Sequence, residues 1–130
     1  MKTGESTPPF SCSDAFLTLA AAEFTPVVEF YQALLGRSPI PHIPNVYAEF
    51  QLPGLRLAIF KPKADHEPEF SQPERSGFSL CLEVPDLEEA IAHLAAIGYP
   101  PEGAIVTASH GRELYAYDPA ENRLILHQSH

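Results

Sequence analysis

The chain has 130 residues, of which 45% are hydrophobic, and it carries a formal net charge of −9 with a pI near 5.0. This length and apolar content are typical of one folded domain and exclude a globally disordered chain. Eight scattered basic residues against seventeen acidic ones argue against nucleic acid or an anionic membrane surface as a partner.

Cysteine usage and hydropathy predict a cytoplasmic protein. Cys12 and Cys81 have neither a CxxC nor another zinc-type spacing, so the pair fits a reducing compartment. Cys81 lies in the apolar run GFSLCLEV and is predicted to be a small core residue. The run AFLTLAAA lacks the basic flank of a secretory signal, and no apolar run reaches the roughly eighteen residues that span a membrane.

The first half of the chain is predicted to contain one helix between strands. Apolar residues three and four positions apart follow Thr25 and Pro26, as on a helix that packs against a core. Thr25 is the expected N-cap, Pro26 suits the first turn, and Gly36 is the expected C-terminal cap. In chain order, the expected segments are a flexible tail (1–13), a buried strand (15–22), this helix (25–36), a loop (37–45) and a hairpin of two strands (46–52 and 55–60).

A charged, proline-rich linker (62–76) precedes a second copy of this order. Asp86 is the expected N-cap of the second helix, Glu89 completes a capping box, and Gly98 ends the helix. His110, Gly111 and Arg112 are predicted to form a turn between two strands. The expected segments are a strand (77–84), a helix (85–98), and three strands (104–109, 113–118 and 123–127).

The two halves form an internal repeat. Gly98 follows Gly36 by 62 residues, and the first strands of the two halves are separated by about the same distance. The repeat predicts an α+β fold in which two tandem βαβββ modules form a curved mixed sheet around a central cleft, with the helices on the outside. The early strand of the first copy is expected within residues 38–45. The expected organisation is the tail (1–13) and a single domain (14–130), in which one module (about 14–61) and another (about 77–130) flank the linker.

Three phrases of the sequence resemble the vicinal oxygen chelate superfamily, which groups glyoxalase I, extradiol dioxygenases and bleomycin-resistance proteins. They are EFYQALLG, SLCLEVPDLEEAIAHLAAIG and HGRELYAYDPAENRLIL. The last phrase resembles the superfamily's DPDGN turn, with Asp118, Pro119 and Asn122 kept. The resemblance covers roughly residues 15–128 and implies the two-module fold, whereas a fold does not by itself imply an activity.

The resemblance also implies where a metal ion would bind. In metal-dependent members, His, Glu or Gln ligands lie on the first and last strands of each module. Phenylalanine and isoleucine offer no lone pair, and a neutral serine hydroxyl is a poor ligand for transition metals. We therefore expect this chain to lack the superfamily metal site and to use no cofactor. The four corresponding positions are Phe16, Phe60, Ser79 and Ile125.

Strand alternation indicates which side chains face the expected cleft. Arg56 is a candidate for holding a carboxylate, or is a solvated arginine beside one of many acidic residues. Tyr115 matches the catalytic tyrosine position of the extradiol members. The cleft itself is either an open pocket or filled by its own aromatic side chains. The candidate ligand-binding residues are Phe16, Arg56, Phe60, Ser79, Glu113, Tyr115, Ile125 and His127.

Two further arrangements involve histidine. His110 and His127 are candidates for a non-standard metal site, and Glu113 with His127 for an acid/base pair. Each also has a structural alternative, because a histidine near a strand end is commonly a surface or hydrogen-bonded residue.

Three function classes remain open. The preferred one is a metal-independent protein that binds a small organic molecule, as bleomycin-resistance members do between dimer partners. The second is a lyase, isomerase or dioxygenase with a relocated metal site, against which the missing ligands count. The third is an interaction module with a filled cleft. A homodimer is a further expectation, with Phe24, Phe50 or Phe70 at its interface.

Overall fold

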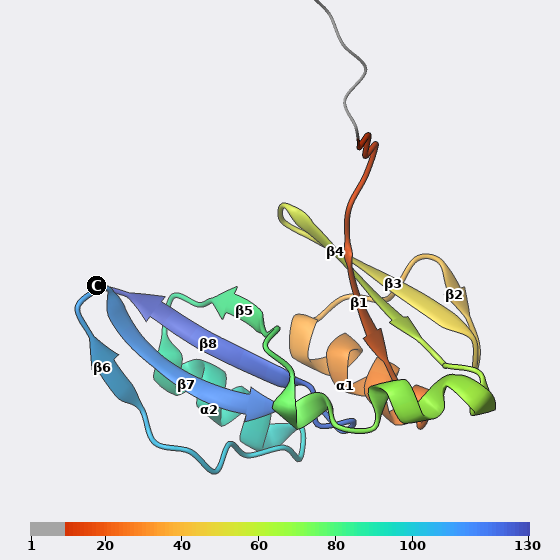
Figure 1. Cartoon of the computed structure of the whole chain (residues 1–130). Helices are drawn as coiled ribbons and strands as arrows, with labels where there is room; N and C mark the ends of the chain where they lie inside the picture. The colour runs from red at the N-terminus through yellow and green to blue at the C-terminus, as the bar shows by residue number, and fades with distance from the viewer. Residues whose placement is uncertain (1–9) are drawn as a thin grey trace, which may run out of the picture.

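The computed structural model describes residues 10–130, which form two four-stranded sheets with one α-helix each (Figure 1). The first sheet has the strand order β1-β4-β3-β2 and the second has the order β5-β8-β7-β6, so the second half repeats the topology of the first. The predicted α+β fold of two tandem βαβββ modules is therefore confirmed. The first module contains β1 (Leu17–Ala20), α1 (Phe24–Leu35), β2 (His42–Ile43), β3 (Tyr47–Leu52) and β4 (Leu55–Phe60). The second contains β5 (Leu80–Glu83), α2 (Leu87–Ala96), β6 (Val106–Ala108), β7 (Gly111–Tyr117) and β8 (Arg123–Ser129).

Each sheet is mixed because its first strand lies parallel to its last. Leu17 of β1 pairs with Leu57 of β4, and Leu80 of β5 pairs with Leu124 of β8, while all other neighbouring strands are antiparallel. Helix α1 packs against β4 and α2 against β8, so the helices cover one face of each sheet.

The apolar spacing predicted helix α1 correctly, whereas the capping signal did not predict where it begins. Its buried residues include Phe24, Val27 and Tyr31, which share one side of the helix. The helix begins at Phe24, with Glu23 in the N-cap position and no side-chain cap, so the prediction of Thr25 as the cap was wrong. Burying Phe24 to 2% exposure outweighs the hydrogen bond that a threonine cap would add. Gly36 ends the helix as predicted, with a left-handed φ of 66°.

Helix α2 begins as the sequence predicts. The Asp86 carboxylate accepts the backbone N–H of Glu89 at 3.0 Å. Its C-cap is Ile97, one residue before the predicted Gly98, which adopts a φ of 97° and donates its N–H to the carbonyl of Ala95. The left-handed glycine thus still terminates the helix, but from the position after the cap.

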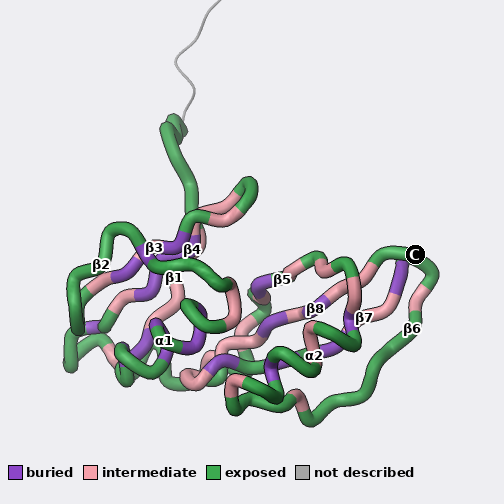
Figure 2. The backbone as a smooth tube through the Cα atoms, turned by 180° about the vertical axis from the view of Figure 1, so that it is seen from behind, coloured by how far each residue is buried: buried purple, intermediate pink, exposed green. Residues whose placement is uncertain are grey.

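Buried contacts join the two modules. The hydroxyl of Tyr31 on α1 donates a hydrogen bond of 2.7 Å to the carboxylate of Asp118, which follows β7 and is 3% exposed. Phe30 packs edge-to-face on Tyr99 with ring centroids 5.0 Å apart. These contacts come from residues far apart in the sequence and connect the two modules. Figure 2 shows buried stretches in the strands and the helix of both modules.

Three expectations about burial were wrong. Cys81 is exposed, because Leu80 and Leu82 of the same strand face inward and alternation turns Cys81 to the open face. Phe24 and Phe50 are buried within the chain, at 2% and 0% exposure, so neither lies at an interface between copies. Phe70 is 42% exposed.

Several segment ends differ from the prediction. The linker contains two short 3₁₀-helices, η1 (Ala64–Phe70) and η2 (Pro73–Arg75), rather than irregular chain alone. Gly111 and Arg112 belong to β7, not to the turn before it, because they pair with Ser129 and Gln128 of β8. The early strand of the first module is β2, inside the expected range.

The predicted tail lies largely outside the described residues. Of its described part, residues 10–13 are exposed and form neither helix nor strand. Within residues 10–130, no helix combines the length and apolar character needed to cross a membrane.

Candidate ligand-binding site

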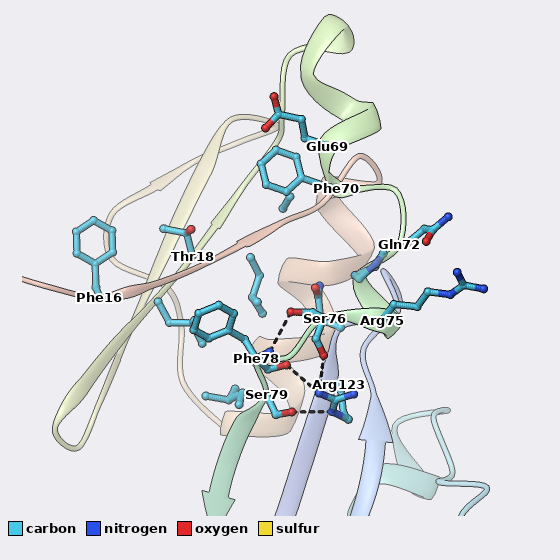
Figure 3. A pocket seen from close by; sticks show the side chains of 16 residues that line it. Phe16, Thr18, Glu69, Phe70, Gln72, Arg75, Ser76, Phe78, Ser79 and Arg123 are labelled. Atoms are coloured by element: carbon cyan, nitrogen blue, oxygen red, sulfur yellow. Dashed lines mark hydrogen bonds between the residues drawn. The ribbon is translucent and has the colours of Figure 1, made fainter.

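A pocket of about 620 Å³ lies between the two modules. One wall is the edge strand β1, the opposite wall is the start of β5, and the linker closes one side (Figure 3). The volume is in the range of small-molecule sites. We call it the seam pocket and define it by six of its lining residues: Phe16, Thr18, Phe70, Phe78, Ser79 and Arg123.

The walls of the seam pocket are mainly aromatic and open. Phe78 is 79% exposed and Phe16 is 45% exposed, and both line the cavity. Large side chains left this uncovered are typical of a binding surface, because water contact with their rings is unfavourable. The pocket therefore suits a ligand with an apolar body.

The candidate residues of the first module reach the seam pocket directly or through one contact. Phe16 lines it, and the Arg56 guanidinium lies 4.7 Å from the centre of the Phe16 ring. Phe60 packs edge-to-face on Phe70 at 5.4 Å, and Phe70 lines the pocket. Arg56 is also paired with the carboxylates of Asp14 and Glu49, so its charge is already balanced within the chain.

The candidate residues of the second module are divided between two places. Ser79 lines the seam pocket. The other four lie on the open face of the second sheet, outside the lining of this pocket, in two cross-strand rows. These rows pair Glu113 with His127 and Tyr115 with Ile125.

The four positions that correspond to superfamily metal ligands do not form a donor set. Phe60 pairs with Ala20 at one end of the first sheet, whereas Phe16 precedes Leu17, which pairs with Leu57 toward the other end. Ile125 pairs with Cys81 rather than with Ser79. Within residues 10–130, no group of three or more His, Cys, Asp or Glu side chains could hold a metal ion. The residues at these positions do not fit the metal of the metal-dependent members.

The structure brings His110 and His127 together on the open face of the second sheet. His110 Nδ1 lies 2.7 Å from His127 Nε2, and His127 Nδ1 lies 2.6 Å from Glu83 Oε1. The backbone N–H and the hydroxyl of Ser129 both donate to the other oxygen of Glu83 at 2.8 Å. Two imidazole nitrogens are fewer than the donors that a zinc site uses, so the cluster is a hydrogen-bonded carboxylate–imidazole–imidazole chain.

The carboxylate hydrogen-bonded to His127 is that of Glu83, and the acid/base pair of Glu113 and His127 stays a prediction. Glu113 is the cross-strand neighbour of His127, and Glu83 is its neighbour on the other side. The hydrogen bond from His127, with those from Ser129, lowers the pKa of Glu83. An ionised Glu83 would orient the ring of His127 in a fixed direction.

Four of the six residues that define the seam pocket were not among the predicted ligand-binding residues: Thr18, Phe70, Phe78 and Arg123. Phe70 and Phe78 lie in or beside the segment interpreted as a linker, and two aromatic residues in a charged, proline-rich stretch were the available signal. Arg123 begins β8 and lies in the seam pocket beside Ser79. The contact between Arg123 and Ser79 could not be predicted, because the two residues are 44 positions apart in the sequence.

Comparisons with known proteins agree with this fold. No protein-family profile matches the chain, and no curated protein is detectably similar to it in sequence. Protein ATC0852 from Agrobacterium tumefaciens has 26% identity over 88% of this chain and 95% of its own, with a TM-score of 0.73. A glyoxalase/bleomycin resistance protein from Catenulispora acidiphila has 22% identity over 90% and 98% of the two chains, with a TM-score of 0.64. A bleomycin-binding protein complexed with bleomycin has 23% identity over 92% and 100%, with a TM-score of 0.64.

The chain has the fold of these proteins, so the fold that the resemblance to the vicinal oxygen chelate superfamily implied is confirmed. Its structural neighbours also include a glyoxalase-related enzyme, a bleomycin resistance determinant and a fosfomycin resistance protein.

Proposed function

We propose that this chain binds a small organic molecule in the seam pocket and does so without a metal ion. The observation that carries the proposal is the open pocket of about 620 Å³ with exposed aromatic walls. The positions that would hold a metal in the superfamily carry phenylalanine, isoleucine and a serine. The bleomycin-binding neighbour supports a binding role for the fold, although its ligand is a property of that protein.

Filling the seam pocket tests the proposal. Thr18 lies on β1, lines the pocket and is exposed, so Thr18→Trp adds bulk without entering the core. We expect the neutral fluorescent probe phenylnaphthylamine to bind the wild-type protein and to bind Thr18→Trp about tenfold or more weakly, because the indole occupies apolar volume. Fluorescence titration measures both affinities.

The matched control for this experiment is Thr25→Trp. Thr25 is exposed on α1 and is not part of the pocket, so this variant carries the same added side chain elsewhere. Equal probe affinity in the wild-type protein and both variants would contradict binding in the seam pocket.

Metal content separates the binding role from the alternative of an enzyme with a relocated metal site. After expression without a histidine tag in medium that contains Ni, Zn, Fe and Mn, we expect far less than one ion per chain by elemental mass spectrometry. The physical reason is the lack of converging donors at the four superfamily positions. A stoichiometric ion that disappears in His127→Ala would favour the enzyme instead.

One observation favours this alternative, an enzyme with a relocated metal site: Glu83, His127 and His110 on the second sheet form a continuous hydrogen-bonded chain.

The homodimer and the cytoplasmic location stay predictions. Gel filtration over a wide range of concentrations tests the first, and a monomer throughout would count against it.

A further inference from the structure

The seam pocket contains an arginine, Arg123, whose charge is not balanced by any carboxylate among residues 10–130. The Arg123 guanidinium donates from Nε to the Ser79 hydroxyl at 2.6 Å and from Nη2 to the carbonyl of Ser76 at 2.7 Å. A longer contact of 3.3 Å joins Nη2 to the carbonyl of Phe78. All three acceptors are neutral oxygen atoms. Figure 3 shows them around the guanidinium at the base of the pocket.

This arrangement differs from that of two other arginines in the same protein. Arg112 makes hydrogen bonds of 2.6 and 2.8 Å to the two oxygens of Glu88, and Arg56 is paired with Asp14 and Glu49. Among residues 10–130, no carboxylate lies within salt-bridge distance of Arg123. The chain has seventeen acidic residues, yet the half-buried guanidinium of Arg123 is not paired with any of those that the structure describes. A negatively charged ligand would provide the missing partner.

The neutral contacts fix Arg123 and leave donors available. A guanidinium has five N–H groups and stays charged in proteins. The contacts of Arg123 use Nε and Nη2, and both N–H groups of Nη1 make no hydrogen bond with the described residues. Because its orientation is set before a ligand arrives, little side-chain entropy is lost when an anion binds.

The charges that line the seam pocket also favour an anion. Its ionisable lining residues are Arg123, Arg75 and Glu69, two positive and one negative, in a protein whose net charge is −9. The pocket is thus a local exception to the acidic surface. The aromatic residues Phe16, Phe70 and Phe78 surround the same space and suit an apolar body.

We propose that the ligand of the seam pocket is an organic anion, with an aromatic or aliphatic body against these phenylalanines and an acidic head group on Arg123. This inference rests on the proposed binding function and names the chemical class of its ligand. Ser79, at a position that supplies a metal ligand in metal-dependent members, here holds the guanidinium. The Arg123 guanidinium, held in one orientation, thereby provides the positive charge in the pocket.

Two probes that share an aromatic skeleton test the charge requirement. Anilinonaphthalene sulfonate carries an anionic group, and phenylnaphthylamine has the same ring system without it. In fluorescence titrations of the full chain, we expect Arg123→Gln to weaken binding of the sulfonate about tenfold or more, through the lost charge-assisted hydrogen bonds, and to leave binding of phenylnaphthylamine unchanged. Arg112→Gln is the matched control, because Arg112 is not a lining residue of the seam pocket and is already paired with Glu88, and it should leave both affinities unchanged.

The outcomes separate this inference from the proposed function. If both probes bind, with an affinity that Thr18→Trp lowers but Arg123→Gln does not, the pocket binds small molecules and the anion requirement is wrong. If neither probe binds in a way that Thr18→Trp weakens, the proposed function itself fails. Should Arg123→Gln not fold, competition on the wild-type protein decides the question. We expect naphthoate to displace the sulfonate probe at a lower concentration than the neutral naphthamide, and equal displacement would overturn the anion proposal.

Discussion

Replacing Asp118 by alanine is expected to lower the free energy of unfolding by about 3 kcal/mol or more, which is large for a domain of this size. The Asp118 carboxylate accepts the Tyr31 hydroxyl at 2.7 Å, the backbone N–H groups of Ala120 and Asn122 at 2.8 and 2.9 Å, and the Asn122 side-chain amide at 2.9 Å. Alanine would leave these buried donors without a partner and would cut the link between α1 and the second module. Urea denaturation monitored by circular dichroism measures the change.

The control for this change is Asp118→Asn, which has the same shape and keeps one carbonyl oxygen as acceptor. We expect it to cost less than the alanine variant, because the Tyr31 hydroxyl can rotate and the Asn122 amide can turn. An alanine variant as stable as the wild-type protein would show that the hydrogen bonds at Asp118 contribute nothing to stability.

The stabilities of the wild-type protein and Asp118→Asn are also expected to depend differently on pH. Burial raises the pKa of Asp118 above its ordinary value of 3.8, and the hydrogen bonds from Tyr31 and Asn122 oppose part of the rise. A carboxyl group with a higher pKa in the folded state contributes stability that is fully present below its unfolded pKa and is lost as the pH rises through the folded pKa. The stability of the wild-type protein relative to Asp118→Asn should therefore fall as the pH rises above 3.8. If the stability of the wild-type protein relative to Asp118→Asn instead increases as the pH rises above 3.8, the pKa of Asp118 is not raised by folding.

Replacing Gly111 by alanine is expected to have an effect of similar size, about 3 kcal/mol or more. Gly111 has a φ of 153°, and a Cβ atom there would lie 2.2 Å from the carbonyl oxygen of Gln128 on β8. That oxygen belongs to the backbone of the paired strand, so relief requires β7 and β8 to separate at the end of the sheet. Thermal and urea denaturation measure the loss.

Gly77→Ala is the matched control for this prediction. A Cβ atom at Gly77 meets no atom within 4 Å, and its φ lies outside the range that favours glycine. We expect the control to have the stability of the wild-type protein. If both glycine variants unfold at the same denaturant concentration, the close approach of the two strands does not constrain Gly111.

The elements of the fold could be predicted from the sequence because each has a local cause. The apolar spacing of α1, the Asp86 cap of α2 and the Pro53-Gly54 turn between β3 and β4 all act within a few residues. Repetition of these signals after 62 residues then predicted two similar modules. The errors at Thr25 and Gly98 moved boundaries by one or two residues and changed no element.

The candidate site was predictable only in part, because its contacts depend on pairings across long stretches of chain. Strand alternation correctly placed Glu113 and His127 on one face, but it could not show that Glu83 of β5 lies on the other side of His127. The prediction that Cys81 is a core residue rested on the apolar residues on both sides of it, whereas alternation with Leu80 and Leu82 turns it to the open face.

The sequence by itself determined the two-module architecture, because periodicity and caps are local properties. Only the tertiary structure decided where a pocket forms. The seam pocket exists because the edge strand β1, the linker and the start of β5 meet in space, and Arg123 reaches it across 44 residues from Ser79. No local pattern encodes that meeting, since it depends on how the buried contacts of Tyr31 and Asp118 set one module against the other.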